Sequence, residues 1–249
     1  MGTVFSFDVR GCTGTAHVRA ALEAAAASLH HADEIFSTYR PDSRISRLGR
    51  GELELSQCGP DVRDVLRLCK DAERRSGGWF SAWYEGGRGN PFDPTGLVKG
   101  WAVERAARML AAAQTDAVCV NGGGDIQLLG GPWRIGIADP LTQGALAAVV
   151  EVGAEARETA VATSGPAERG CHIIDPHTGE PPVTGLASVT VVCSTLTAAD
   201  AWATAAYAMG DRARAWLEDL PDAEGFAVTS DGGTWHTSGF GRYATAVRP

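Results

Sequence analysis

The stretch "VTVVCSTLTAADAWATAAYAMG" (residues 189–210) predicts a buried strand that runs into a buried helix, because an apolar β-branched run is followed by small and apolar residues. Within the helical part, Asp200 and Thr204 are four positions apart and share one face. One interpretation is structural: Asp200 sits in the first turn of the helix, where the positive end of the helix dipole favours a carboxylate, and Thr204 bonds back to the carbonyl of residue 200. The other is a hard-cation site, in which a carboxylate and a hydroxyl supply two ligands and phosphate oxygens supply others. This stretch alone leaves both open.

The sequence around this stretch predicts blocks of helices and strands. Strand signals separated by Gly, Pro and Asp turns fill residues 116–194, including a short strand at 172–174, and others lie near 3–9, 225–230 and 234–238. Helical patterns cover residues 16–37, 61–76, 97–114 and 211–220, whereas 38–48 is expected to be irregular and 77–96 a loop. Because the elements do not alternate strictly, we expect a layered α+β fold with a mixed or antiparallel sheet and packed helices, in one domain spanning residues 1–249.

Composition excludes several classes of protein. The formal net charge of the 249 residues is −8 and the arginines are scattered among acids, which argues against a nucleic-acid partner. No apolar run approaches the roughly 20 residues of a membrane span. The six cysteines lack metal-like spacing, so buried free thiols are expected. With no charged leader visible, the expected location is cytoplasmic, or exported if a leader was removed.

Two glycine-containing motifs are candidates for ligand contacts. The "NGGGDI" motif (121–126) is not a dinucleotide-binding loop, since residue 127 is glutamine and a strand follows. Its glycines, Gly123 among them, would let a ligand approach the backbone, with Asp125 as an acceptor; a tight hairpin turn is the alternative. The "DPTGLVKGWAVERA" motif (93–106) places Asp93, Gly96 and Lys99 where a helix begins, which favours an anion. Its alternative is a capped helix with a solvated lysine.

His172 is a candidate acid, base or charge stabiliser. It lies in "TSGPAERGCHIIDPHTG" (163–179), and it would face away from Cys171 on a strand, so the two would not form a nucleophilic pair. The alternative is a histidine with a purely structural role.

In chain order, several of these blocks resemble the ApbE family of FAD:protein FMN transferases. The matching blocks are "MGTVFSF", "FSTYRPDSRISRL", "DPTGLVKGWAVERAARML", "VNGGGDI", "WRIGIADP", "TSG" with "HIIDPHTG", and "VTVVCSTLTAADAWATAAYAMG". The resemblance implies a Mg²⁺-dependent enzyme that takes FAD as substrate. It would move FMN to a threonine hydroxyl of a partner flavoprotein and release AMP.

The resemblance also implies site residues. Asp200, Thr204 and the backbone carbonyl of Gly96 would be metal ligands, and His172 the catalytic histidine. The implied contacts with the flavin nucleotide are Met1, Tyr39, Asp93, Lys99, Gly123, Asp125 and Ile173. For Tyr39 we expect stacking on a ring of the nucleotide, against the alternative of a core tyrosine.

Two features depart from the family pattern. Ser81 stands where an aspartate is expected, and the interval before residue 93 is sharply shortened, which concerns one wall of the FAD pocket. Glu104 replaces the usual aspartate after "KGWAV". The alternatives to a transferase are an FAD pyrophosphatase that uses water in place of threonine, and an FAD-binding protein without turnover.

Overall fold

The computed structural model describes residues 2–12, 14–84, 92–166 and 173–247. The helices within these ranges are α1 (Thr15–Phe36), α2 (Arg44–Gly49), α3 (Pro60–Arg75), α4 (Thr95–Ala111), α5 (Leu196–Met209) and α6 (Ala213–Glu218). The strands are β1 (Phe5–Arg10), β2 (Ala117–Gly122), β3 (Asp125–Leu129), β4 (Trp133–Ala138), β5 (Leu146–Val152), β6 (Glu158–Ser164), β7 (Leu186–Cys193), β8 (Glu224–Thr229), β9 (Thr234–His236) and β10 (Ala244–Val247). Short 3-10 turns occur at Leu55–Gln57, Gly210–Arg212 and Phe240–Arg242.

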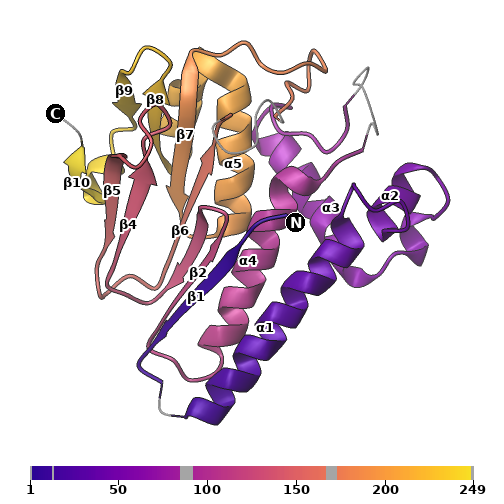
Figure 1. Cartoon of the computed structure of the whole chain (residues 1–249). Helices are drawn as coiled ribbons and strands as arrows, with labels where there is room; N and C mark the ends of the chain where they lie inside the picture. The colour runs from indigo at the N-terminus through magenta and orange to yellow at the C-terminus, as the bar shows by residue number, and fades with distance from the viewer. Residues whose placement is uncertain (1, 13, 85–91, 167–172, 248–249) are drawn as a thin grey trace.

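Two antiparallel sheets form the framework (Figure 1). The larger has seven strands in the order β1-β2-β3-β6-β7-β8-β9, and the smaller has three in the order β10-β5-β4. Every strand pair in these sheets is antiparallel. The expected α+β class is therefore confirmed, and the sheets are antiparallel instead of mixed.

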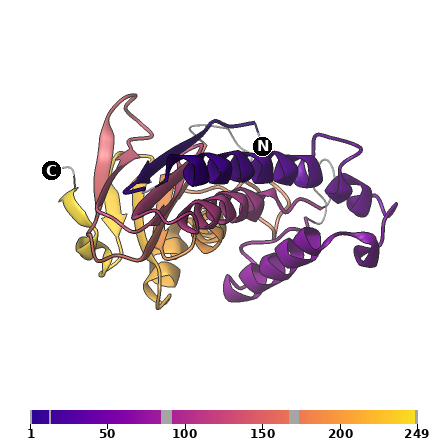
Figure 2. The same ribbon diagram turned by 90° about the horizontal axis from the view of Figure 1, so that it is seen from below.

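Helices cover one face of the larger sheet. In this layer α4 contacts β2 and β3, and α5 contacts β6 and β7. Figure 2 shows α1, α4 and α3 side by side in that order. The core between helices and sheet includes alanines of α5 and helix-facing positions of the strands, such as Val189 and Val191. The repeated alanines therefore allow α5 to lie close to the sheet.

The smaller sheet covers the opposite face and makes a second core. Its tryptophan and isoleucines, Trp133, Ile135 and Ile137, pack with residues of the larger sheet that face away from the helices, such as Ile126 and Phe226. Strand β3 thus buries both faces, and all five of its residues are buried. A strand covered on both sides needs no polar alternation, which explains the continuous apolar runs of the sequence.

Two local expectations were wrong, and one strand was not predicted. Residues 44–49, expected to be irregular, form the short helix α2, because Ser43 caps it by accepting a hydrogen bond from the Ser46 N–H at 3.1 Å. Ile173 and Ile174 are not in a strand. They lie directly before a turn in which the Thr178 and Gly179 N–H groups donate to the Asp175 carbonyl. Strand β10 was not predicted from the sequence. It pairs with β5, which lies far away along the chain.

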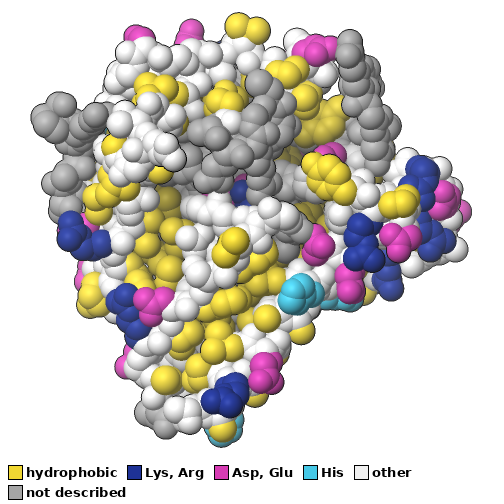
Figure 3. Space-filling model, in the orientation of Figure 1, with side chains coloured by type: hydrophobic (Ala, Val, Ile, Leu, Met, Phe, Trp, Pro, Cys, Tyr) yellow, Lys and Arg dark blue, Asp and Glu magenta, His cyan; other side chains and the backbone are white. Residues whose placement is uncertain are grey.

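The surface and the thiols agree with the composition. Figure 3 shows Lys and Arg side chains interspersed with Asp and Glu on the face it presents. Cys58, Cys69 and Cys193 are buried free thiols, while Cys119 is half-buried and Cys12 is exposed. Burial raises the pKa of Cys193 to about 11, so it stays protonated. Among the described residues, no helix combines the length and apolar character needed to cross a bilayer.

Helices α4 and α5 touch at Gly100. A Cβ at this position would lie 2.4 Å from the carbonyl oxygen of Leu196 and 2.8 Å from Cβ of Asp200. The Gly100 backbone N–H also donates a 2.9 Å hydrogen bond to the Asp200 carboxylate, across 100 residues of sequence. Only glycine allows this approach, because the nearest atom is backbone and cannot rotate away.

We therefore expect Gly100→Ala to destabilise the fold, although alanine is the better helix former by roughly 1 kcal/mol. Forcing a methyl group into this contact should cost about 1–3 kcal/mol net in the free energy of unfolding, measured by urea denaturation. Gly241→Ala is the matched control, because a Cβ there meets nothing within 4 Å. Equal stabilities of the two variants would contradict the packing described for α4 and α5.

Candidate functional site

A cavity of about 610 Å³ opens where strands of the larger sheet end, between the helical layer and the β4–β5 connection. Eight of the residues expected from the sequence line it: Asp93, Gly96, Lys99, Gly123, Asp125, Ile173, Asp200 and Thr204. They come from α4 and the segment before it, from α5, from the β2–β3 turn and the start of β3, and from the segment after residue 172. The fold therefore brings together motifs that are far apart along the chain.

Asp200 and Thr204 both line this cavity from α5. Asp200 is the fifth residue of the helix and is buried, so it does not sit in the first turn as the structural interpretation expected. One carboxylate oxygen accepts the Gly100 N–H, and the other lies 3.9 Å from Nζ of Lys99. Thr204 Oγ1 lies 3.5 Å from Oγ of Ser164, and a Cβ on Gly96 would be 3.8 Å from it. Side-chain oxygen atoms from α5 and β6 thus lie beside the backbone of Gly96 at the start of α4.

Lys99 joins the two carboxylates at the centre of the cavity. Its ammonium group pairs with the Asp125 carboxylate as well as lying near Asp200. The Lys99 side chain is only 16% exposed and that of Asp125 is 2% exposed, which rules out the solvated lysine considered from the sequence. Asp125 also accepts the Thr163 backbone N–H at 3.0 Å. This ion pair therefore ties α4 to the larger sheet.

The "NGGGDI" motif forms the tight hairpin turn that was one of its two interpretations. Gly123 and Gly124 form the two-residue turn between β2 and β3, with φ values of +61° and +89°. Positive φ at both positions is the geometry of a tight hairpin and favours glycine. The same two glycines line the cavity, so the turn also exposes backbone to it.

The segment before α4 supplies a wall of the cavity that the sequence did not reveal. Asp93 Oδ1 accepts the Thr95 N–H at 2.9 Å, where the helix begins. Tyr84 lines the cavity beside it, and burial together with the Asp93 charge raises the pKa of this phenol, which keeps it neutral. Ser81 is buried and bonds to Glu73 and to the Trp83 N–H instead of lining the cavity. A tyrosine at this place had no family motif to mark it.

Three expected residues are not placed in the cavity. Met1 and His172 lie outside the described residues. The Tyr39 side chain is 96% exposed and does not line the cavity, so it is not a core tyrosine. Asp139 is a cavity residue that our expectations missed, although it lies in the "WRIGIADP" block. Asp139 lies in the connection between β4 and β5. The fold brings this connection to the cavity although it is distant in sequence from α5.

The donor set of this cavity suits a hard cation. The described lining residues include four aspartates, Asp93, Asp125, Asp139 and Asp200, and a single lysine. No group of three or more His, Cys, Asp or Glu side chains gathers as a metal site within the described ranges. A cation at Asp200 would accordingly need the Thr204 hydroxyl, backbone carbonyls and ligand oxygens, which is the mixed oxygen set that Mg²⁺ accepts.

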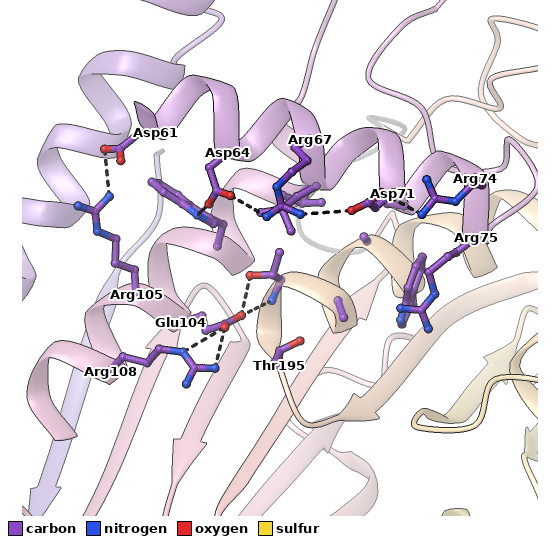
Figure 4. Close-up of a pocket in the computed structure, with 18 of the residues that line it drawn as sticks. Asp61, Asp64, Arg67, Asp71, Arg74, Arg75, Glu104, Arg105, Arg108 and Thr195 are labelled. Carbon is purple, nitrogen blue, oxygen red and sulfur yellow. Dashed lines mark hydrogen bonds and ion pairs between the residues drawn. The ribbon is translucent and has the colours of Figure 1, made fainter. Parts of the chain in front are cut away.

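A larger cavity, of about 960 Å³, lies between α3, α4 and α5 (Figure 4). Its charged side chains are paired with one another, as in Asp61 with Arg105 at 3.0 Å and Glu104 with Arg108 at 3.0 Å. It contains none of the expected site residues that the structure describes. Size alone therefore does not mark the functional site here.

Comparison with known proteins matches the ApbE family over residues 1–86 and 84–227. The FAD:protein FMN transferase of Treponema pallidum is 31% identical over 165 residues, which cover 57% of this chain and 45% of that protein. The corresponding figures for the Escherichia coli K12 enzyme are 30% over 162 residues, 58% and 44%. This chain thus spans about half the length of the curated relatives it matches.

Solved structures share the fold. The ApbE protein of Thermotoga maritima superposes with a TM-score of 0.83 at 22% identity, covering 100% of this chain and 97% of that one. The flavin transferase ApbE of Vibrio cholerae gives a TM-score of 0.77 at 23% identity, with 98% and 96% covered. Since the family match extends over most of the sequence and includes the motifs that line the cavity, the chain belongs to the ApbE family.

Proposed function

We propose that this chain is a Mg²⁺-dependent FAD:protein FMN transferase, which moves FMN from FAD to a threonine hydroxyl of a partner flavoprotein and releases AMP. The observation that carries the proposal is the convergence of Lys99, Asp125, Asp200 and Thr204 in one cavity. Membership of the ApbE family and the names of its curated relatives, which are FAD:protein FMN transferases, support the same activity. We also propose that residues 1–249 act as a single domain, since the cavity draws on both halves of the chain.

Charge explains why a metal would be required. FAD carries a diphosphate, and the described lining residues hold more carboxylates than cations. Two like unit charges roughly 4 Å apart repel by about 4 kcal/mol at an effective dielectric constant of 20. Lys99 is already paired with Asp125 and cannot offset this repulsion alone. Bound Mg²⁺ would supply the missing positive charge at the diphosphate.

The protein groups have distinct proposed roles. Asp200, Thr204 and the Gly96 carbonyl would hold the cation, and Lys99 would sit beside the phosphates. The Gly100 N–H, which a regular helix directs at the carbonyl of Gly96, donates to Asp200. Asp200 and the Gly96 carbonyl therefore compete for the same N–H group. Because the Gly96 oxygen shares its donor, it is more available to bind a cation.

The reacting hydroxyl would come from outside the chain. The acceptor threonine oxygen would bond to the phosphorus of the FMN half, while the bond from that phosphorus to the bridging oxygen breaks and AMP leaves with that oxygen. The hydroxyl proton would pass to a base, for which His172 remains the candidate from the sequence. This arrangement needs no nucleophilic side chain in the cavity itself, in keeping with alignment and charge as the main contributions.

The direct test is transfer of FMN. Incubation of the protein with FAD, MgCl₂ and a flavoprotein domain bearing an acceptor threonine should yield one covalent FMN per acceptor and one AMP. Mass spectrometry of the acceptor and chromatography of the nucleotides measure the two products. Omitting Mg²⁺, or replacing the acceptor threonine by valine, should abolish the covalent adduct.

Two results would redirect the assignment. FMN and AMP formed at the same rate without an acceptor would make the protein an FAD pyrophosphatase. Tight FAD binding without either product would make it a flavin carrier. Both alternatives would keep the same cavity and change only the fate of the diphosphate.

Removing the Asp200 charge should abolish turnover. Asp200→Asn retains an oxygen for the Gly100 N–H but weakens the cation site, so we expect a loss of about 100-fold or more in kcat. Thr204→Val removes the second side-chain ligand at nearly constant volume and should also raise the Mg²⁺ concentration for half-maximal activity. Initial rates across a MgCl₂ series measure both effects.

Asp211→Asn is the matched control for Asp200→Asn, because Asp211 is exposed just beyond the same helix. Circular dichroism should show that all three variants are folded. Wild-type kinetics in Asp200→Asn would remove the metal site from the proposal.

A further inference from the structure

The buried amide of Gln127 makes hydrogen bonds to several separate segments of the chain. Its Oε1 accepts the Leu196 backbone N–H at 2.8 Å. Its Nε2 lies 3.1 Å from the carbonyl oxygen of Ser194 and 3.3 Å from those of Leu128 and Thr159. The orientation of the amide is fixed, because a backbone N–H faces one end and carbonyls face the other. Gln127 is fully buried, and its bonds to Leu196, Leu128 and Thr159 are buried as well.

The bond to Leu196 is made at the first residue of α5. The first backbone N–H groups of a helix have no partner within the helix. The N-cap Thr195 makes no side-chain bond to them. Instead, Gln127 of β3 accepts from Leu196, and Glu104 of α4 accepts from Thr197 at 3.0 Å. The start of α5 is thus held by side chains from other elements.

Gln127 also shares a face of β3 with a cavity residue. Side chains two apart on a strand point to the same side. Asp125 and Gln127 both reach toward the helices, where Asp125 pairs with Lys99 of α4. The two positions therefore link one strand to both helices that carry the proposed site.

The composition of α5 makes such a link necessary. Half of the helix is alanine, and its surface toward the sheet consists of small side chains. Contacts between small apolar groups are non-directional and resist sliding along the helix axis weakly. A hydrogen bond at 2.8 Å is directional and fixes the axial position.

We propose that Gln127 is a positioning residue, which fixes α5 against β3 so that Asp200 and Thr204 meet Lys99 and Asp125. Leu196 precedes Asp200 by one helical turn, so a shift at Leu196 is transmitted to both residues. The proposal rests on the proposed function for its effect on activity. Its structural part, the anchoring of the start of α5, stands apart from that function.

The first test measures anchoring directly. Gln127→Met keeps a similar length and removes both polar ends of the side chain. Hydrogen exchange followed by mass spectrometry should show faster exchange in peptides covering residues 194–200 of this variant. Thr237→Val is the matched control: Thr237 is also fully buried and hydrogen-bonded to backbone, but near β8 and β9, away from α5. It should leave exchange in 194–200 unchanged.

The second test measures the metal site. Because a shift of α5 would move both proposed side-chain ligands, Gln127→Met should raise the half-saturating MgCl₂ concentration at least about 10-fold, the lower end of the loss seen when groups that orient metal ligands are removed. Calorimetric titration of MgCl₂ into protein with FAD gives the same quantity without turnover. Gln127→Asn keeps an amide but is one methylene group shorter, so it should lose the bond to Leu196 and change both assays in the same direction. Thr237→Val should lower stability without moving the Mg²⁺ response.

The outcomes separate the two proposals. Unchanged exchange and unchanged Mg²⁺ response in a folded Gln127→Met would overturn the role of Gln127. If that variant does not fold, Gln127→Asn decides: faster exchange at 194–200 than in the wild type supports the anchoring role, and wild-type exchange refutes it. A wild-type protein that neither transfers nor hydrolyses FAD refutes the proposed function, while the exchange comparison still tests the anchoring.

Discussion

The close contact between α4 and α5 at Gly100 is the constraint on which the site depends. Without a side chain at Gly100, the backbone of α4 comes near enough for its N–H to bond to the Asp200 carboxylate. That bond turns Asp200 toward α4, where Lys99 lies one residue away in sequence. Since Lys99 pairs in turn with Asp125, one backbone contact aligns two helices and a strand.

The buried charges contribute little net stability to the fold. Burying carboxylates and an ammonium group costs several kcal/mol per ion in desolvation, which pairing only partly offsets. The apolar layers on both faces of the sheet supply the stability that tolerates this cost. An arrangement that is unfavourable for folding but directed at one cavity is typical of a functional site.

The sequence predicted the local part of the site and missed the nonlocal part. The spacing of Asp200 and Thr204, and the helix start carrying Asp93, Gly96 and Lys99, are visible within a few residues, and the structure places all five in one cavity. Tyr84, Asp139 and Gln127 have no local pattern. Their roles arise from packing between segments that only the folded chain brings together, as do α2 and β10 among the elements.

The segment before α4 lies where the two stretches of the family match meet, at residues 84–86. Ser81 bonds locally to Glu73 and Trp83, so it does not take the place of an aspartate in the cavity. The bridge between Trp83 and Phe92 instead sets Tyr84 and Asp93 side by side at the wall. The Tyr84 phenol, which burial keeps neutral, therefore lines the cavity without adding charge to a wall that already carries the Asp93 carboxylate.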